Sequence, residues 1–356
     1  MNDLSWAVRP AMAGTAAMRL LIVTDAWHPQ VNGVVRTVDT VTEHLKRSGD
    51  TVEVIGPDRF RTLPLPSYPE IRIVPWPRRR LQRLVDEFAP DAIHIATEGP
   101  LGWAMRAICL KRGWPFTTSF HTRFPEYLQA RTGLPPGLAW GMLRRFHAAG
   151  SGVFAATASL RAELRRRGFT NLRAWTRGVA LEQFRPGDTD PAFTNPWADL
   201  PRPISLYVGR VAVEKNIEAF LQLDLPGSKV VVGDGPQRAA LQRRFPDVHF
   251  AGWRQGQELA AAYAGADVFV FPSVTDTFGL VLLEAMACGT PVAAFPVTGP
   301  LDVVAPGTGA LGQDLRAAVL AALDCDREAC RRHAEGFSWQ ACAETFRQHL
   351  VMLPRD

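Results

Sequence analysis

The chain is poor in features that would place it at once in a secreted, metal-bound or membrane-spanning class. Its five cysteines are few for 356 residues and follow no zinc-finger spacing, which is typical of a reducing cytoplasm. No apolar run approaches the roughly 20 residues of a membrane-spanning helix. Residues 1–17 contain Asp3 and Pro10 and lack a continuous apolar core, so they do not resemble a signal peptide. We expect 1–17 to be a disordered extension, or to precede a true start at Met18.

Two common ligand-binding signatures are also missing. The first predicted strand, 19–25, leads through a glycine-bearing loop to a helix over 34–48, but the loop lacks the Gly-x-Gly-x-x-Gly fingerprint of dinucleotide sites. Asp-x-Asp pairs, which often hold a metal, occur at 188–190 and 324–326, in a predicted linker and between two late helices. The sequence therefore predicts no metal site.

The composition that is present is that of a globular protein with an acidic ligand. Hydrophobic residues make up 47% of the chain and charged residues 21%, and the length has room for two domains. The formal net charge of +5 favours phosphates, anionic lipid or nucleic acid as partners. No recognition motif for nucleic acid is found, so we expect no nucleic-acid partner.

One stretch, residues 267–295, carries the most specific pattern in the chain. The apolar run 267–272 predicts a buried strand, and a polar turn follows over 273–277. Residues 279–288 predict a helix that ends at Gly289, and 292–295 predict a second buried strand. The stretch is therefore a strand, a turn, a helix and a strand.

Two carboxylates bracket the start of that helix, with seven residues between them, at Asp276 and Glu284. The free N–H groups of Gly279, Leu280 and Val281 lie between the two acids, and a helix N-terminus attracts anions. We infer a diphosphate at the helix start, with a hydroxyl-rich group held by each acid. A nucleotide sugar has this layout. The alternative is a buried βαβ unit whose acids are incidental.

The same stretch resembles the motif of two glutamates seven residues apart in retaining GT-B glycosyltransferases of family 4. Asp276 replaces the first glutamate, and the sequence Thr-Asp-Thr-Phe278-Gly resembles the branch of GDP-mannose-dependent α-mannosyltransferases and related glycolipid glycosyltransferases. The resemblance implies an α/β fold of the GT-B type, in which two Rossmann-like domains face a central cleft. Phe278 is then a donor-binding residue.

Further segments in the second half of the chain extend the resemblance. The segment Gly-Arg210 to Lys215-Asn matches the family segment whose cations neutralise the leaving nucleoside diphosphate. Two cations beside a glycine at a strand exit suit a diphosphate, although surface charge is the alternative. The family pattern also implies donor contacts at a glycine turn, Gly233, and at a base-reading segment with Gly252 and Arg254.

In the first half, strand and helix patterns alternate, which favours a parallel sheet covered on both faces. Predicted strands cover 51–55, 71–76, 91–96, 116–122 and 152–157, and predicted helices include 81–88 and 158–168. Ligands bind beyond the carboxyl ends of such strands, where Asp25, Glu98 and His121 fall. The resemblance implies that His121 contacts the donor sugar near its anomeric centre and that Gly33 lies near the phosphates. A structural histidine and an ordinary turn are the alternatives.

The sequence also predicts how the chain is divided. We expect an N-terminal acceptor domain over 18–186, a linker over 187–203 and a nucleotide-sugar domain over 204–335. By the resemblance, the last segment, 336–356, is a helix that crosses back to the first domain.

The predicted function is metal-independent transfer of a hexose, with retention, from a nucleotide sugar to a lipid or glycan hydroxyl. GDP-mannose is the favoured donor, no cofactor is required beyond it, and the predicted catalytic residues are His121, Arg210, Lys215 and Asp276. The alternatives are a UDP-sugar-dependent glycolipid (diacylglycerol) transferase and a nucleotide-sugar epimerase of the same fold. Arginine clusters at 78–80, 144–145 and 165–167 predict peripheral contact with an anionic membrane on its cytoplasmic face.

Overall fold

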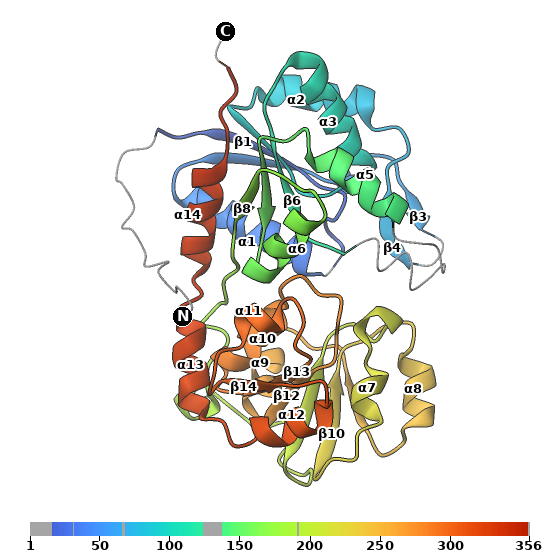
Figure 1. Ribbon diagram of the computed structural model, residues 1–356, viewed down its shortest axis with the longest axis vertical. Helices are drawn as coiled ribbons and strands as arrows, with labels where there is room; N and C mark the ends of the chain where they lie inside the picture. Colours follow the sequence, from blue (N-terminus) through green and yellow to red (C-terminus); the bar gives the residue numbers. More distant parts are fainter. Residues whose placement is uncertain (1–15, 31, 66–67, 124–136, 191, 355–356) are drawn as a thin grey trace.

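The computed structural model describes residues 16–30, 32–65, 68–123, 137–190 and 192–354. Residues 1–15 of the expected disordered extension therefore lie outside the described residues. Residues 124–136 of the expected N-terminal acceptor domain also fall outside them. Figure 1 shows two domains stacked one above the other, each built around a sheet. No described helix is long and apolar enough to cross a membrane.

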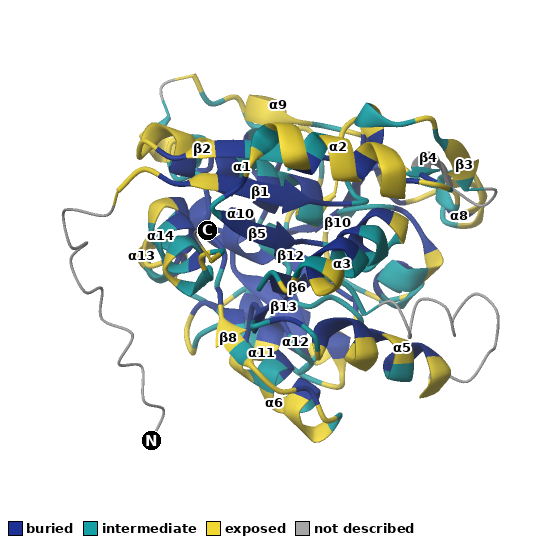
Figure 2. Cartoon of the chain, turned by 90° about the horizontal axis from the view of Figure 1, so that it is seen from above, coloured by how far each residue is buried: buried dark blue, intermediate teal, exposed yellow. Residues whose placement is uncertain are grey.

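The first domain is built on a six-stranded parallel sheet with the order β2-β1-β5-β6-β7-β8. Its strands are β1 (Arg19–Val23), β2 (Thr51–Ile55), β5 (Ala92–Ile95), β6 (Thr117–Phe120), β7 (Gly152–Ala155) and β8 (Leu172–Ala174). Because side chains alternate along a strand, Leu20 and Ile22 pack on one face and Leu21 and Val23 on the other. Both faces are buried, as Figure 2 shows for β1 and β5.

Helices cover both faces of this sheet. The face of Leu20 packs against α1 (Gly33–Arg47) and α14 (Trp339–His349). The opposite face packs against α2 (Arg78–Phe88) and α3 (Pro100–Arg112). A separate cluster joins β6 and β7 to α5 (Gly137–His147) and α6 (Ala158–Arg166). Local sequence explains where α1 and α14 begin, because the side chains of Asn32 and Ser338 accept hydrogen bonds from their first-turn N–H groups.

One predicted strand does not join the parallel sheet. The sequence predicted a strand over 71–76, whereas β3 (Leu63–Leu65) and β4 (Tyr68–Ile73) form a separate antiparallel pair. Between β2 and this pair lies only a short 3₁₀ turn, η1 (Pro57–Arg59). A parallel neighbour of β2 would need a crossover connection of a dozen or more residues, whereas the two strands of a hairpin need about two residues between them. The short connection after β2 therefore favours local antiparallel pairing of β3 with β4.

The second domain repeats the architecture with the parallel order β11-β10-β9-β12-β13-β14. Its strands are β9 (Ile204–Val208), β10 (Ser228–Val232), β11 (His249–Gly252), β12 (Val268–Phe271), β13 (Val292–Ala294) and β14 (Gly309–Leu311). One face packs against α9 (Gly256–Ala264), α10 (Leu280–Ala287) and α13 (Arg327–Glu335). The other packs against α7 (Glu218–Leu221), α8 (Arg238–Arg244) and α12 (Leu315–Ala322). A short helix, α11 (Pro300–Val303), follows β13.

The chain passes between the domains at two adjacent points. The backbone N–H of Val179 donates to the carbonyl of Phe337 at 3.0 Å, which joins the two passing segments. Gly178 is required there, because a Cβ atom would lie 2.3 Å from the backbone nitrogen of Trp339. After the second crossing, α14 lies beside the first domain, whereas α13 lies beside the second (Figure 1).

The first crossing lies earlier than the linker predicted over 187–203. Val179 and Phe184 already pack into the core of the second domain. Trp197, inside the predicted linker, is 2% exposed and its Nε1–H donates to the carbonyl of Ala262 at 3.0 Å. The polar and proline-bearing composition that predicted a linker therefore belongs to a segment bound to the second domain. These contacts favour a domain boundary near residue 178.

Candidate functional site

A cavity of about 970 Å³ lies between the two domains. Each sheet has a point where the strand order reverses, between β1 and β5 in the first domain and between β9 and β12 in the second. Ligands bind at such switch points. Residues that follow all four strands line the cavity. The predicted site residues that line it are Gly33, His121, Arg210, Lys215, Gly233, Arg254, Asp276, Phe278, Gly279, Leu280, Val281 and Glu284.

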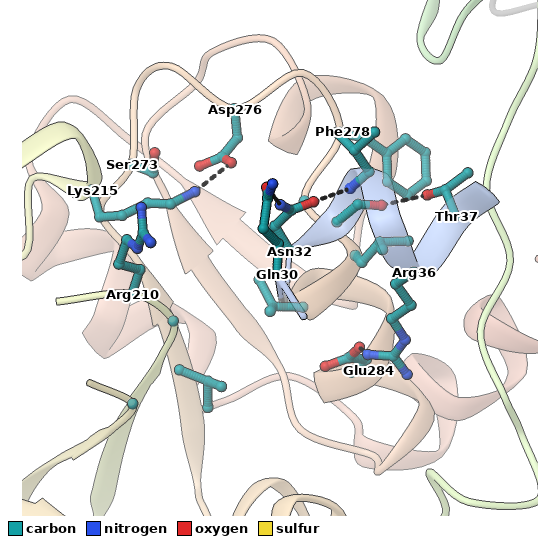
Figure 3. Close-up of a pocket in the computed structure, with 18 of the residues that line it drawn as sticks. Gln30, Asn32, Arg36, Thr37, Arg210, Lys215, Ser273, Asp276, Phe278 and Glu284 are labelled. Carbon is teal, nitrogen blue, oxygen red and sulfur yellow. Dashed lines mark hydrogen bonds and ion pairs between the residues drawn. The ribbon is translucent and has the colours of Figure 1, made fainter. Parts of the chain in front are cut away.

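On the second-domain side, a cation and an acid from two strand exits meet. Lys215 Nζ lies 2.6 Å from Asp276 Oδ1 (Figure 3). The loops that carry them are joined by hydrogen bonds, from Asn216 Nδ2 to the carbonyl of Pro272 and from the Thr275 hydroxyl to the carbonyl of Glu214. The sequence assigned Lys215 to the diphosphate and Asp276 to a hydroxyl-rich group beside it. The structure places both groups close enough to contact one ligand at the boundary between those parts.

The second oxygen of Asp276 is available to a ligand. Asp276 Oδ2 is buried and has no hydrogen-bond partner among the described residues. The hydroxyl of Ser273, at the same strand exit, is likewise buried without a partner. Buried polar atoms are usually hydrogen-bonded, and both residues line the cavity. A hydroxyl-rich ligand would satisfy both atoms.

The helix start next to Asp276 is shaped by a glycine. Gly279 precedes α10 with a φ of +86°, in the left-handed region that side chains rarely adopt. A Cβ atom here would lie 3.0 Å from the Leu282 side chain, so the position is also tight. The first N–H groups of a helix have no partner within the helix, and Gly279, Leu280 and Val281 line the cavity. This arrangement suits an anionic group at the start of α10.

Glu284 lies one turn deeper in the cavity and is 3% exposed. The hydroxyl of Tyr263 donates to its Oε2 at 3.0 Å, and Arg36 of the first domain pairs with its Oε1 (Figure 3). A buried carboxylate needs such partners, because an unpaired buried charge is strongly unfavourable. Burial and the charge of Glu284 raise the pKa of Tyr263 well above its ordinary value, so its hydroxyl stays a donor. Glu284, which was expected to hold a hydroxyl-rich group, is thus also a contact between the domains.

His121 forms the first-domain side of the cavity at the end of β6. Its Nδ1 accepts a hydrogen bond from Arg177 Nη2 at 3.2 Å, and its carbonyl accepts one from the Thr277 hydroxyl at 2.6 Å. Its Nε2 is buried and has no partner among the described residues. Burial, and next the positive charge of Arg177, lower the pKa of His121 well below its ordinary value. The ring is therefore neutral at physiological pH.

The two acids predicted at the same sheet edge are already occupied. The carboxylate of Asp25 accepts hydrogen bonds from the N–H groups of Leu101 and Gly102, at 2.8 and 3.2 Å, at the start of α3. Burial raises its pKa, although these bonds oppose the shift. Glu98 Oε1 lies 3.0 Å from His147 Nε2, and Glu98 does not line the cavity. Of the acids predicted at this edge, only Asp25 lines the cavity.

The predicted base-reading segment is divided by the structure. Trp253 and Arg254 line the cavity, whereas Gly252 does not. The carbonyl of Gly252 accepts a hydrogen bond from the N–H of Gly233 at 2.8 Å. Gly233 itself must be glycine, since a Cβ atom would lie 1.9 Å from the carbonyl oxygen of Gly209. The close approach of these backbones forms the wall of the cavity beside β9 and β10.

Sequence reasoning did not find two of the cavity's charged groups. It did not link Arg36 to Glu284, since no local pattern connects residues 248 positions apart. It also gave Arg177 no role, although the residue is buried, lines the cavity and contacts His121. The described residues contain no cluster of three histidine, cysteine, aspartate or glutamate side chains that could hold a metal.

Comparison with known proteins shows the family of the chain. Residues 31–183 match the family model described as Glycosyltransferase Family 4, and residues 202–325 match the model described as Glycosyl transferases group 1. The GDP-mannose-dependent alpha-mannosyltransferase of Mycobacterium tuberculosis (strain CDC 1551 / Oshkosh) is 33% identical over 310 residues, or 81% of this chain and 82% of that protein. The sulfoquinovosyl transferase of Arabidopsis thaliana is 30% identical over 77% of this chain and 58% of that protein.

Among solved structures, sucrose-phosphate synthase from Thermosynechococcus elongatus matches with a TM-score of 0.74 and 23% identity. The match covers 93% of this chain and 98% of that chain, and at this identity it shows the fold alone. The predicted GT-B fold and the predicted hexosyltransferase activity are confirmed. The chain belongs to glycosyltransferase family 4.

Proposed function

We propose that this enzyme transfers a hexosyl group from a nucleotide sugar to a lipid or glycan hydroxyl with retention of configuration and without a metal. GDP-mannose is the donor that we place first, because a relative that is 33% identical over most of the chain is named for it. The observation that carries the proposal is the grouping of Arg210, Lys215, the start of α10 and Glu284 around one cavity. These groups match a diphosphate and the ribose beside it.

The chemistry assigns most of the work to positive charge. The bond between the anomeric carbon and the phosphate oxygen breaks, and its electron pair leaves on the diphosphate. Arg210, Lys215 and the N–H groups at the start of α10 meet that charge, and preorganised charge of this kind is usually the largest catalytic contribution. The acceptor oxygen bonds to the anomeric carbon on the same face, and its proton passes to the leaving phosphate oxygen. No metal is needed for this charge balance.

In this proposal, the carboxylate of Asp276 and the neutral ring of His121 orient the sugar. Asp276 Oδ2 accepts a hydrogen bond from a sugar hydroxyl while Oδ1 stays on Lys215. The Nε2 atom of His121 lies on the opposite side of the cavity and supplies a donor near the anomeric centre. Glu284 accepts from the ribose hydroxyls while it remains paired with Arg36, because a carboxylate has about four acceptor sites.

A donor panel tests the proposal. The protein is incubated with GDP-mannose, UDP-glucose or UDP-glucuronic acid, each with and without extracted membrane lipid, and the products are read by mass spectrometry. We expect a lipid-dependent gain of one hexose with GDP-mannose, unchanged by a chelator, and an α linkage by NMR. Conversion of a donor sugar without any acceptor would indicate an epimerase instead. Activity that requires added metal would contradict metal independence.

A UDP-linked donor is the second candidate. It is favoured by the 30% identity to a sulfoquinovosyl transferase, whose name shows that relatives of this chain transfer sugars other than mannose. In the same panel, transfer from a UDP-sugar and none from GDP-mannose would select this candidate. Arg210, Lys215 and Glu284 serve either donor, because they face the diphosphate and the ribose that the two donors share.

We also propose peripheral contact with an anionic membrane through α5 and α6. The Arg144 guanidinium donates to the carbonyl of Arg167, so the basic ends of the two helices lie together. On α5, Leu138 is 90% exposed and Met142 is 42% exposed beside these arginines. Each exposed cation near an anionic bilayer contributes about 1 kcal/mol, and an exposed leucine adds apolar contact.

Vesicle sedimentation tests this contact. The protein is expected to pellet with anionic vesicles at low salt, to be released at high salt and to stay in solution with neutral vesicles. Replacing Arg144 and Arg145 by glutamine should weaken pelleting. The matched control replaces Arg79 and Arg80, which are exposed on α2, outside α5 and α6. Equal losses in both variants would contradict a site on α5 and α6.

A further inference from the structure

Arg177 is a buried guanidinium in an unusual setting. It follows β8, is 4% exposed, and donates through Nη1 to the carbonyls of Trp175 and Thr176 at 2.8 and 2.9 Å. Its guanidinium also lies 4.1 Å from the centre of the Trp175 ring. Within the described part of the chain, no carboxylate forms an ion pair with it. Backbone carbonyls and a ring therefore hold a buried positive charge at the wall of the cavity.

The remaining contact of Arg177 determines the protonation of His121. Arg177 Nη2 lies 3.2 Å from His121 Nδ1. A guanidinium only donates, so Nδ1 must carry a lone pair, and in a neutral imidazole the proton is then on Nε2. That Nε2–H is buried and unpartnered among the described residues, and His121 lines the cavity. An unpartnered buried donor is unfavourable, so this one is prepared for an acceptor atom on a ligand.

The position of the ring is determined by both domains. The carbonyl of His121 accepts from the Thr277 hydroxyl, and Thr277 adjoins Asp276 on the opposite wall of the cavity. Arg177 therefore orients the ring while Thr277 holds its backbone. Burial lowers the pKa of Arg177 to about 10, at which the guanidinium remains charged at neutral pH.

We propose that Arg177 is a positioning residue for the transfer reaction: it holds His121 as the neutral Nε2–H tautomer, so that the ring donates a hydrogen bond to an oxygen of the bound donor sugar. This inference rests on the proposed function, which supplies that sugar. Arg177 acts through His121 and does not itself contact the reacting atoms. Loss of the guanidinium would leave the ring free to rotate or to carry its proton on Nδ1.

The chain offers a matched control at Arg331. Its Nη1 also donates to backbone carbonyls, those of Phe184 and Ala287, at 2.7 and 3.0 Å. Unlike Arg177, it pairs with a carboxylate, Glu335, and it does not line the cavity. Arg331→Met therefore removes an arginine whose work is structural, and it should lower stability while donor binding and kcat stay within about twofold of wild type.

The first experiment reads the tautomer without substrate. Two-bond ¹H–¹⁵N correlation of the labelled free protein gives the tautomer of each histidine, and His121 is assigned by the signal lost in His121→Ala. We expect Nε2–H in the wild type and in Arg331→Met, and a mixture or Nδ1–H in Arg177→Met. Where Arg177→Met does not fold, Arg177→Lys gives the same test, because lysine has no second arm for Nδ1. An Nδ1–H signal in the wild type, or no change in a folded Arg177 variant, would overturn the proposal.

The second experiment is a double-mutant cycle in kcat with the active donor. We expect Arg177→Lys to lower kcat by roughly tenfold to a hundredfold, in the range that coupled neighbours show. In the His121→Ala background, the same change should lower kcat by less than about twofold, because the ring that it positions is absent. A full additional loss there would show that Arg177 acts without His121. A wild type that transfers no sugar would defeat the proposed function, while the NMR result would still decide the tautomer.

Discussion

The two walls of the cavity use opposite chemistry. The second-domain wall carries charges in pairs, Lys215 with Asp276 and Arg36 with Glu284, the arginine coming from the opposite domain. The first-domain wall presents a neutral ring, His121, and an acid, Asp25, that is occupied by the start of α3. The difference teaches that similar folds provide different ligand chemistry, because the side chains at the strand exits differ. The second-domain wall is suited to a diphosphate flanked by the hydroxyl groups that Asp276 and Glu284 would hold, and the first-domain wall offers the Nε2–H of His121 to an acceptor atom.

The largest expected effect comes from removing charge at the second-domain wall. Arg210→Ala and Lys215→Ala should each lower kcat by about a hundredfold, which corresponds to about 3 kcal/mol, because the leaving diphosphate loses a contact. Steady-state kinetics with the active donor measures this. Lys229→Ala is the control, since that lysine donates to carbonyls of Leu221 and Leu223 away from the cavity. Near wild-type turnover in both cavity variants would remove the two cations from the mechanism.

The next effect separates the two acids of that wall. Glu284→Gln should weaken binding of both the donor and the free nucleoside diphosphate by about 2 kcal/mol, because both carry the ribose. Asp276→Asn should weaken binding of the whole donor but leave the nucleoside diphosphate within about twofold. Isothermal calorimetry with the two ligands distinguishes the cases. Equal losses for both ligands in both variants would contradict this division of roles.

Arg36→Met sharpens the same comparison, because it removes the partner of Glu284 but leaves the acid. Without Arg36, the buried carboxylate of Glu284 has no ion-pair partner, so the free energy of unfolding should fall by about 2 kcal/mol. Binding of a ribose should restore only part of this loss. Urea denaturation with and without the nucleoside diphosphate measures both values. Stability equal to that of the wild type would show that the ion pair between the domains contributes nothing.

A smaller effect concerns the neutral histidines behind the first-domain wall. His94 is 1% exposed, and burial lowers its pKa to about 3. The unfolded chain binds a proton on this residue below about pH 6.5 and the folded protein does not, so stability must fall as pH falls from 6.5 toward 3. Each pH unit in this range lowers the free energy of unfolding by about 1.4 kcal/mol through this residue. Urea denaturation at pH 7 and pH 5 should show a smaller loss in His94→Asn than in wild type, with the exposed His249→Asn as control.

The smallest effect tests a contact between the domains outside the cavity. The backbone N–H of Ser159 at the start of α6 donates to Asp302 Oδ1 at 2.9 Å, and its hydroxyl donates to Oδ2. Ser159→Ala keeps the first bond and should cost about 1 kcal/mol or less in unfolding free energy, with kcat unchanged. A large loss of kcat would show that this contact, and not only the cavity walls, controls how the domains meet.

Much of the second-domain wall could be predicted because its features are local. Asp276, Gly279 and Glu284 lie within one strand–turn–helix unit. The hydrophobic pattern of the unit and its glycine predict the position of all three residues at the helix start without knowledge of the rest of the chain. Gly252, which the resemblance gave as a donor contact, does not line the cavity, because a motif match does not show which residues of a segment face a ligand. The linker was placed too late for a similar reason, since polar composition does not show that Trp197 is buried against Ala262.

The sequence by itself determined the alternation of strands and helices, the caps at Asn32 and Ser338, and the acids and glycine around the start of α10. Each of these depends on residues within one turn or one strand, where backbone geometry is set by near neighbours. Only the tertiary structure decided that Arg36 pairs with Glu284 and that Arg177 orients His121, across 248 and 56 positions. Such partners are selected by the packing of two domains, because a buried charge or donor is satisfied by whichever complementary group the fold brings into reach.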